Sequence, residues 1–471
     1  MSSPQGISPS TAGTDLVRSL LAAGPPLLLL TTLVAVLAPK GTAWLMPLQG
    51  IAACLAYVFA RGRAAVPALP ARPLALSGAM LVAVVLLSAV NSADTRASLA
   101  AAALLAAYLC AAGASVLNIA REHTSAIEQY MRMVAIAVFA GAMFLAIELL
   151  TGSAIQRFLF THIPLIRPDS PAHVGMQDGR VTVWAADEMN AGIAVANMLL
   201  WPAILGATAL WHRPNLYFGI ALFALVLAVT FLSNHETSKV AIVAGATVFA
   251  LFALSPQAAR KLVLCTWVLG IALIVPAAHL AYDARLHQAE WMPVNARARL
   301  IIWDATASRV PDAPLLGVGA AATKTMTQAE NAQIRPDHVI PWDVGAHAHN
   351  IYLQIWYEVG LLGAVMLMAL GCAMIWWISM LPLSAQRYAL STFTVAAAIG
   401  ASSWGLWQPW FMATYCFVAT VTVLAVRSTR TLPSGSNCSA RSQPVSDLEP
   451  QHPHPESICD RLRPLPARER L

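Results

Sequence analysis

His347, His349 and Asn350 stand together directly before a segment whose apolar residues have helical spacing. Asn350 has a side chain that commonly caps a helix N-terminus, so a helix is predicted to begin there. The positive end of a helix dipole favours a neutral imidazole. With a reference pKa of about 6.5, a neutral histidine can act as a general base near pH 7. The pattern predicts a catalytic histidine, with Asn350 and Glu358 as orienting residues; the alternative is a pair of solvated loop histidines.

Four cationic side chains upstream suit an anionic ligand: Arg180, Lys239, Arg297 and Arg299. Guanidinium groups match phosphate oxygens with two parallel hydrogen bonds. Arg297 and Arg299 are two residues apart and cannot share a helical face, so one can bind a ligand while the other is solvated. Lys239 opens an apolar stretch, where a helix dipole disfavours a cation unless an anion binds nearby. The alternatives are contacts with lipid headgroups for the arginines, snorkelling for Lys239 and a solvated loop for Arg180.

The composition defines the environment of these groups. Of 471 residues, 58% are hydrophobic and only 11% are charged, with a mean hydropathy of +0.63. Soluble proteins are about 25% charged. This excludes a soluble enzyme, a disordered protein and a nucleic-acid-binding protein. The 29 basic and 23 acidic residues give a net charge of +6, which membrane topology explains better than an anionic partner.

Twelve apolar stretches are long enough to be candidates for crossing a bilayer core of about 30 Å. They lie at residues 19–38, 42–60, 73–90, 97–119, 133–150, 190–211, 215–232, 239–254, 262–282, 359–380, 388–404 and 409–426. The predicted fold is an all-α integral membrane protein with about 12 transmembrane helices over residues 1–426. The first stretch is expected to be a retained helix, because residues 1–18 lack a basic leader. Residues 427–471 are rich in proline and predict a disordered cytoplasmic tail.

The distribution of lysine and arginine predicts the orientation. With both termini in the cytoplasm, 17 of these residues lie inside and six lie in the shorter outside loops. Two long loops, 151–189 and 283–349, then face outward, and their aromatic residues favour short helices on the outer membrane face. The candidate residues lie in or beside these loops, except for Lys239, which opens the stretch 239–254. No cysteine lies in an outside loop, and no Cys/His spacing indicates a metal, so neither a disulfide framework, a metal nor a cofactor is predicted.

Four motifs occur in this chain: His347-x-His349-Asn350-x-x-Leu353 with Glu358 and Gly360, Arg299-x-x-x-Trp303 followed by Pro314-Leu-x-Gly-x-Gly, Thr237-Ser238-Lys239, and the block from Arg180 to Asn190-Ala191. Through these motifs the chain resembles the O-antigen ligase and polymerase superfamily over roughly residues 180–365. Many relatives carry arginine in place of Lys239. Lysine still provides a positive charge for phosphate but loses the two-pronged geometry.

The resemblance implies an O-antigen ligase with a fold of the GT-C glycosyltransferase type in the bacterial inner membrane. Such an enzyme moves a glycan from undecaprenyl diphosphate to a hydroxyl of lipid A-core on the periplasmic side. The family inverts the anomeric centre and needs neither nucleotide nor metal; no Asp-x-Asp occurs in the outside loops of this chain. Both substrates have lipid tails, so they are expected to enter from the surrounding membrane lipids.

The resemblance also implies roles for the candidate residues. Arg299 and Lys239, with Arg297 or Arg180 as further candidates, would stabilise the leaving diphosphate. His349 is the first choice as the base, and His347 either replaces it or orients the acceptor. An O-antigen polymerase and a protein O-oligosaccharyltransferase share the motifs and stay open as alternatives. A lipid or glycan flippase is the alternative that is not an enzyme, although it would need charges along a path through the membrane.

Overall fold

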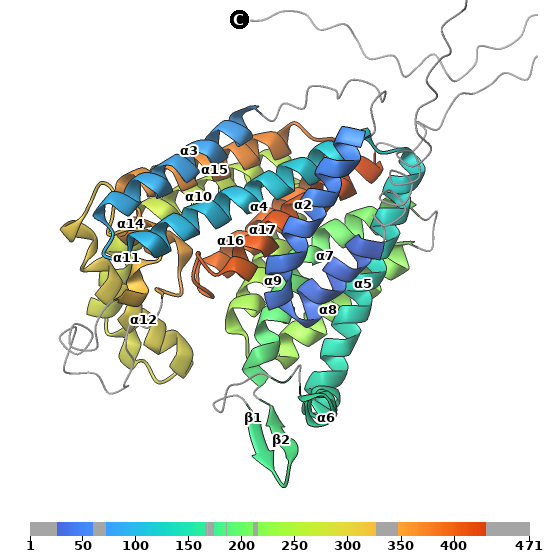
Figure 1. The fold of residues 1–471 in the computed structure, drawn as a ribbon, viewed down its shortest axis with the longest axis horizontal. Coiled ribbons are helices and arrows are strands. Elements are labelled where there is room, and N and C mark those ends of the chain that lie inside the picture. Colours follow the sequence, from blue (N-terminus) through green and yellow to red (C-terminus); the bar gives the residue numbers. More distant parts are fainter. Residues whose placement is uncertain are drawn as a thin grey trace, which may run out of the picture. The chain divides into compact units, whose positions relative to one another are not determined.

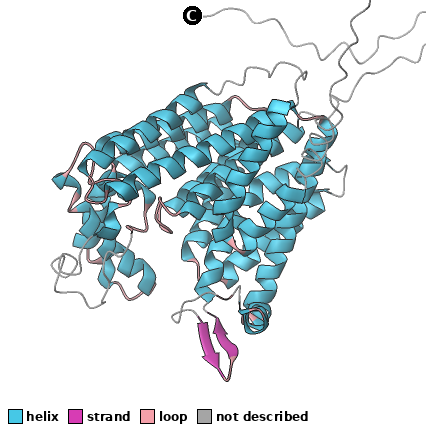
Figure 2. Ribbon diagram, viewed as in Figure 1, coloured by secondary structure: helices cyan, strands magenta, loops and turns pink. Residues whose placement is uncertain are grey.

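The computed structural model describes residues 26–59, 72–164, 167, 174–184, 186–210, 215–325 and 347–429. The chain divides into two units, Met1–Leu432 and Pro433–Leu471, and every described residue belongs to the first. The predicted tail therefore lies outside the described residues, apart from the last turn of α17. The described chain is almost entirely helical, with one β-hairpin (Figure 2).

A helix lies at each of the twelve apolar stretches. These helices are Pro26–Leu37, α2 (Thr42–Phe59), α3 (Arg72–Ser88), α4 (Thr95–Arg121), α5 (Thr124–Leu150), α7 (Asn190–Leu210), α8 (Asn215–Leu232), α9 (Glu236–Leu254), α10 (Pro256–Ala272), α11 (Ile274–Asp283), α15 (Gly360–Ser379), α16 (Leu383–Gly400) and α17 (Pro409–Thr429) (Figure 1). Helices satisfy their own backbone hydrogen bonds, which is why apolar stretches in a membrane protein adopt them.

The predicted number of spans is not confirmed. Within the described residues, seven helices are long and apolar enough to cross a membrane: α3, α4, α5, α7, α9, α15 and α17. The count reaches eight if α10 and α11 form one span. The stretch 262–282 is not one straight helix, because α10 and α11 meet at a bend of 71°. Pro276 has no N–H to donate to the Ala272 carbonyl, which explains the break. The similarity to the GT-C type stays a prediction.

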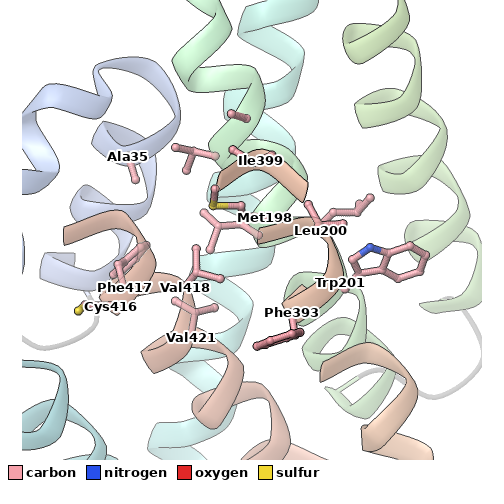
Figure 3. Packing of buried hydrophobic residues seen from close by; sticks show 14 of the residues in the cluster. Ala35, Met198, Leu200, Trp201, Phe393, Ile399, Cys416, Phe417, Val418 and Val421 are labelled. Atoms are coloured by element: carbon pink, nitrogen blue, oxygen red, sulfur yellow. The ribbon is translucent and has the colours of Figure 1, made fainter. Parts of the chain in front are cut away.

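The centre of the bundle is α7, which is apolar on all sides and therefore buried. It packs against α5, α8, α16 and α17. Figure 3 shows Met198 and Leu200 of α7 beside Ile399 of α16 and Val418 of α17. A buried amide is paired within this core, since Asn197 Nδ2 donates to Thr230 Oγ1 at 2.8 Å. The core therefore connects α7 with α16 and α17, and α16 packs in turn against α9.

The described parts of the two long loops contain the predicted short helices. The first contains α6 (Ala154–His162), and the second contains α12 (Val294–Ala307), which packs against α11 and against α14 (Ile351–Glu358) (Figure 1). Their position on the outer membrane face stays a prediction. The first loop also contains a hairpin that the sequence analysis did not predict, β1 (Val174–Gln177) paired antiparallel with β2 (Arg180–Trp184).

The hairpin has a recognisable sequence signal. Asp178 and Gly179 connect its strands and have φ values of 50° and 74°. Two successive residues with positive φ are typical of a type I′ turn, for which Asp-Gly is among the favoured pairs. The all-α prediction therefore overlooked a local turn motif within a chain that is otherwise helical.

Candidate active site

The predicted helix cap is confirmed. Asn350 is buried in front of α14, and its side-chain oxygen accepts hydrogen bonds from the backbone N–H groups of Tyr352 and Leu353 at 3.0 and 3.1 Å. His349 immediately before it has a φ of 52°, a left-handed conformation that is uncommon outside glycine. The cap and this backbone conformation together determine where the imidazole of His349 projects.

His349 has one ring nitrogen bonded and the other without a described partner. Its Nδ1 lies 2.7 Å from the carbonyl oxygen of Ser403. A carbonyl only accepts, so Nδ1 carries the proton in the neutral ring and Nε2 carries the lone pair. Among the described residues, none forms a hydrogen bond with Nε2. Burial lowers the pKa of His349, and the charge of Arg299 lowers it further against the effect of the Ser403 bond. The ring is therefore suited to accept a proton at Nε2.

His347 lies beside His349, with 4.1 Å between the ring centroids, but its surroundings differ. Its Nδ1 faces the backbone N–H of His349 at 3.2 Å. Trp410 Nε1 donates to Gln408 Oε1 at 2.9 Å, which leaves the Gln408 amide nitrogen facing His347 Nε2 at 3.1 Å. Burial, then the neighbouring His349 and Arg299, lowers the pKa of His347 to about 3. A neutral imidazole has one N–H and one lone pair, so one of these nitrogens accepts a hydrogen bond and the other carries the ring proton. Because both nitrogens already contact neighbouring groups, this ring is a poorer acceptor for a substrate proton.

Arg299 projects from α12 towards the same group of residues. Its Nη1 donates to Thr237 Oγ1 at 3.2 Å and to Ser402 Oγ at 3.1 Å. Thr237 Oγ1 itself donates to the Ser402 carbonyl at 2.8 Å, so α9, α12 and the α16–α17 turn meet here. Burial lowers the pKa of Arg299, yet an arginine stays charged in proteins. The result is an anchored cation beside two neutral imidazoles.

A third histidine, which the sequence analysis did not select, belongs to this cluster. His235 precedes α9 and is buried, with its Nδ1 at 2.7 Å from Ser238 Oγ and its Nε2 at 3.5 Å from Ser403 Oγ. Its ring centroid lies 5.2 Å from that of Trp404. Burial and the charge of Arg299 lower the pKa of His235 to about 3. His235 lies four residues before Lys239 in the same short motif, so the sequence signal for this histidine is its place beside Thr237-Ser238-Lys239.

Within the described residues, Arg299 is the one of the four predicted cations that is hydrogen-bonded into the cluster. Lys239 Nζ pairs instead with Glu236 Oε1 at 2.8 Å on its own helix. Arg297 is half-buried, and its Nε has no hydrogen-bond partner among the described residues. Arg180 is exposed at the start of β2. No hydrogen bond or ion pair within the described chain connects these three side chains with Arg299, so their roles in diphosphate binding stay predictions.

Glu358 orients loops rather than a histidine. Its carboxylate is fully buried at the end of α14. Five donors surround it: the backbone N–H groups of Ala321 and Thr323, the Thr323 hydroxyl, the Gln354 amide and the Trp407 indole. Burial raises the pKa of Glu358, whereas the bonds from Thr323, Trp407 and Ala321 lower it. The charged form satisfies all five donors, so Glu358 joins α14 to the segment after α12 and to the α16–α17 turn.

The junction at Glu358 explains the glycines of two sequence motifs, Pro314-Leu-x-Gly-x-Gly and the Gly360 that follows Glu358. Gly317 and Gly360 have φ values of 67° and 72°, and a β-carbon on either would collide with the backbone of the other segment. Gly319 N–H donates to the Glu358 carbonyl at 2.9 Å. The two glycine segments therefore pack backbone to backbone, which brings Glu358 to its donors and ends α14 before α15 begins.

Metal ligands do not gather at this site. Within the described ranges, no group of three or more His, Cys, Asp or Glu side chains is arranged to hold a metal ion. The five cysteines in the described chain are all free. The chemistry of the described site is that of an anchored guanidinium, three neutral imidazoles and hydroxyl groups.

The fold and site define a multi-pass helical membrane protein with a buried histidine–arginine cluster. Residues 198–368 match the family model described as O-Antigen ligase. A similar protein of Rickettsia prowazekii is 26% identical over 244 residues, which is 51% of this chain and 59% of the relative. One of Rickettsia typhi is 25% identical over 244 residues, with the same shares. Both are named as candidate polysaccharide ligases. These findings show that residues 198–368 resemble the O-antigen ligase family and that this half of the chain is similar to polysaccharide ligases.

The matched regions include some residues of the candidate site and leave out others. The chain spans about three fifths of the length of the curated relatives that it matches. The family match includes Lys239, Arg297, Arg299, His347 and His349. It ends before the α16–α17 turn and begins after Arg180. The residues of that turn which contact the cluster, Ser402, Ser403 and Gln408 among them, were found from the structure alone.

Proposed function

We propose that this protein is an O-antigen ligase. It transfers a glycan from undecaprenyl diphosphate to a sugar hydroxyl of lipid A-core on the periplasmic side of the inner membrane. The observation that carries the proposal is the combination of His349, whose Nε2 lone pair has no described partner, with the anchored charge of Arg299 beside it. The family match and the polysaccharide ligase relatives support the coarser activity, glycan transfer by a membrane enzyme.

The proposed reaction is a single displacement at the anomeric carbon. The acceptor oxygen attacks from the face opposite the diphosphate, the bond from the anomeric carbon to the diphosphate oxygen breaks, and the configuration inverts. The hydroxyl proton moves to His349 Nε2, and undecaprenyl diphosphate leaves. The Ser403 carbonyl stabilises the resulting imidazolium through Nδ1–H. Removal of a general base lowers the rate by about 10²–10⁴-fold.

Arg299 is proposed to stabilise the charge that develops on the leaving diphosphate. Its hydrogen bonds to Thr237 and Ser402 engage Nη1, so the other guanidinium nitrogens have donors for phosphate oxygens. A preorganised donor of this kind contributes about 3–4 kcal/mol to the transition state. No step of this mechanism needs a metal or a nucleotide, because the diphosphate is already a good leaving group.

Complementation of a ligase-deficient Gram-negative strain with matched donor and core tests the proposal. Wild type is compared with His349→Ala and Arg299→Ala, and with the exposed control variants His123→Ala and Arg96→Ala. Lipopolysaccharide is analysed on gels, and the amount of each variant in the membrane is measured. We expect wild type and both controls to restore the ladder on lipid A-core, and both site variants to lose it.

Other outcomes identify the alternatives. Lengthening of the lipid-linked glycan without transfer to lipid A-core would identify a polymerase, and glycan on periplasmic proteins would identify a protein O-oligosaccharyltransferase. A flippase should tolerate His349→Ala, since it needs no base. A ladder that persists in His349→Ala and disappears in His347→Ala would move the role of the base to His347.

A further inference from the structure

The turn between α16 and α17, residues 402–408, contacts the candidate site along its whole length. Its contacts are Ser402 with Arg299, Ser403 with His349 and His235, Trp404 with His235, Gly405 with His347, Leu406 N–H with Gln354, Trp407 with Glu358, and Gln408 with His347. These partners come from three separate segments of the chain: His235, Arg299 and residues 347–358. A connecting loop with this many contacts to one cluster has a role beyond joining two helices.

Two of these contacts involve different parts of His347. A β-carbon at Gly405 would lie 2.7 Å from both Cβ and Cγ of His347, closer than real β-carbons come to other atoms. At the far end of the ring, the Gln408 side-chain amide nitrogen lies 3.1 Å from Nε2. The absence of a side chain at 405 makes room for the ring, and Gln408 fixes its rotation. His349 is fixed in the same way by the Ser403 carbonyl.

We propose that residues 402–408 are a positioning element of the transferase site. The Ser403 carbonyl holds His349 as its Nδ1–H tautomer, which presents Nε2 to the acceptor. Gly405 and Gln408 hold His347 beside it in one orientation. This inference rests on the proposed function, because positioning has meaning only if the cluster catalyses transfer. None of these residues touches the reacting atoms by our assignment, so their effects pass through the histidines.

Gly405→Ala tests the steric half of the proposal, namely that the absence of a side chain at 405 leaves room for the His347 ring. The alanine would displace His347, and with it the neighbouring His349 ring, while the contacts of Arg299 with Thr237 and Ser402 persist. Displacement of a catalytic group by about 1 Å lowers the rate by about 10²-fold. With the full-length protein in detergent, lipid-linked glycan and lipid A-core, we expect kcat to fall by about that factor. KM for the donor should change less than about twofold.

The matched control for this variant is Gly113→Ala. A β-carbon at Gly113 in α4 has nothing within 4 Å, so this substitution should leave kcat and KM unchanged. Equal kcat in Gly405→Ala and wild type, for equal amounts of folded protein, would overturn the steric half. A loss that appears entirely as a lower amount of folded protein, with normal kcat in the remainder, would overturn it as well.

Gln408→Glu tests the polar half of the proposal, namely that the Gln408 amide fixes the orientation of the His347 ring. This substitution leaves the side-chain shape almost unchanged. The new carboxylate can still accept from Trp410 Nε1, but it faces His347 Nε2 with a negative charge. The other charged or titratable groups that act on His347 are His349 and Arg299. An opposite charge at this distance raises the pKa of an imidazole by about one unit or more. The histidine pair then takes up its first proton at higher pH.

The ring centroid of His349 lies 4.1 Å from that of His347, so the new carboxylate also favours the charged form of the proposed base. We therefore expect the acid limb of the kcat profile in Gln408→Glu to move to higher pH. A purely structural role of the turn would lower the rate at every pH without moving this limb. An unmoved limb would overturn the polar half. If wild type transfers glycan and His349→Ala does not, while both turn variants behave as wild type, the positioning inference fails alone. If wild type transfers nothing, the proposed function fails first.

Discussion

Replacement of Glu358 by glutamine should destabilise the protein, because the Glu358 carboxylate joins α14 to the segment after α12 and to the α16–α17 turn. The carboxylate has two donors on Oε1, both from Thr323, and three on Oε2, from Ala321, Gln354 and Trp407. Glutamine has one oxygen. Its NH₂ group is best placed at the Oε1 position, where the Thr323 hydroxyl can turn to accept and only the Thr323 N–H loses its acceptor.

The magnitude follows from these bonds. A buried donor without an acceptor costs about 1–3 kcal/mol. The three remaining bonds lose their charge assistance, which is worth about 1 kcal/mol each. Relief of the burial of a charge offsets part of this loss. We therefore expect Glu358→Gln to lower the free energy of unfolding by about 2–5 kcal/mol. Activity should fall too, because Glu358 holds the turn that contacts the histidines.

Thermal unfolding of the purified protein in detergent measures the first effect, and glycan transfer by the folded fraction measures the second. The matched control is Glu290→Gln, since Glu290 is exposed and has no hydrogen bond within the described chain. We expect a clearly lower Tm for Glu358→Gln and an unchanged Tm for the control. If Glu358→Gln unfolds at the wild-type temperature, the carboxylate does not hold the junction and the reasoning from its donors is wrong.

Three further predictions concern the site. Arg299→Lys keeps a charge but cannot bond Thr237, Ser402 and a phosphate in the same geometry, so kcat/KM should fall by about 10–10²-fold in the transfer assay. Gly317→Ala should lower both Tm and activity, because φ is positive and the β-carbon meets the Glu358 backbone; Tm equal to wild type would contradict this. Burial lowers the pKa of His349 below 6.5, so the acid limb of the kcat pH profile should lie below pH 6.5 if His349 is the base, as proposed.

The membrane character and the positions of the helices could be predicted from the sequence because they depend on local composition. Each apolar stretch contains a helix, and Asn350 caps α14 as its side chain predicts. The number of spans could not be predicted in the same way. Length alone made residues 262–282 a single span, whereas Pro276 divides it into α10 and α11. The Asp178-Gly179 pair is also a local signal and favours a hairpin turn, but the surrounding chain is helical and the predicted fold was all-α.

The candidate site was predictable only where one short motif contains the chemistry. His349 and Arg299 are polar groups in an apolar chain, and such groups are usually functional. The turn at 402–408 has no comparable signal, because its serines, glycine and glutamine are ordinary loop residues. Ser403 is 54 residues from His349 in the sequence, and Ser402 is 165 residues from Thr237. No local sequence pattern predicts contacts over such separations. Because Ser403 acts on His349 through its backbone carbonyl, residue identity at 403 carries little of this information, and only the folded chain reveals which tautomer the imidazole adopts.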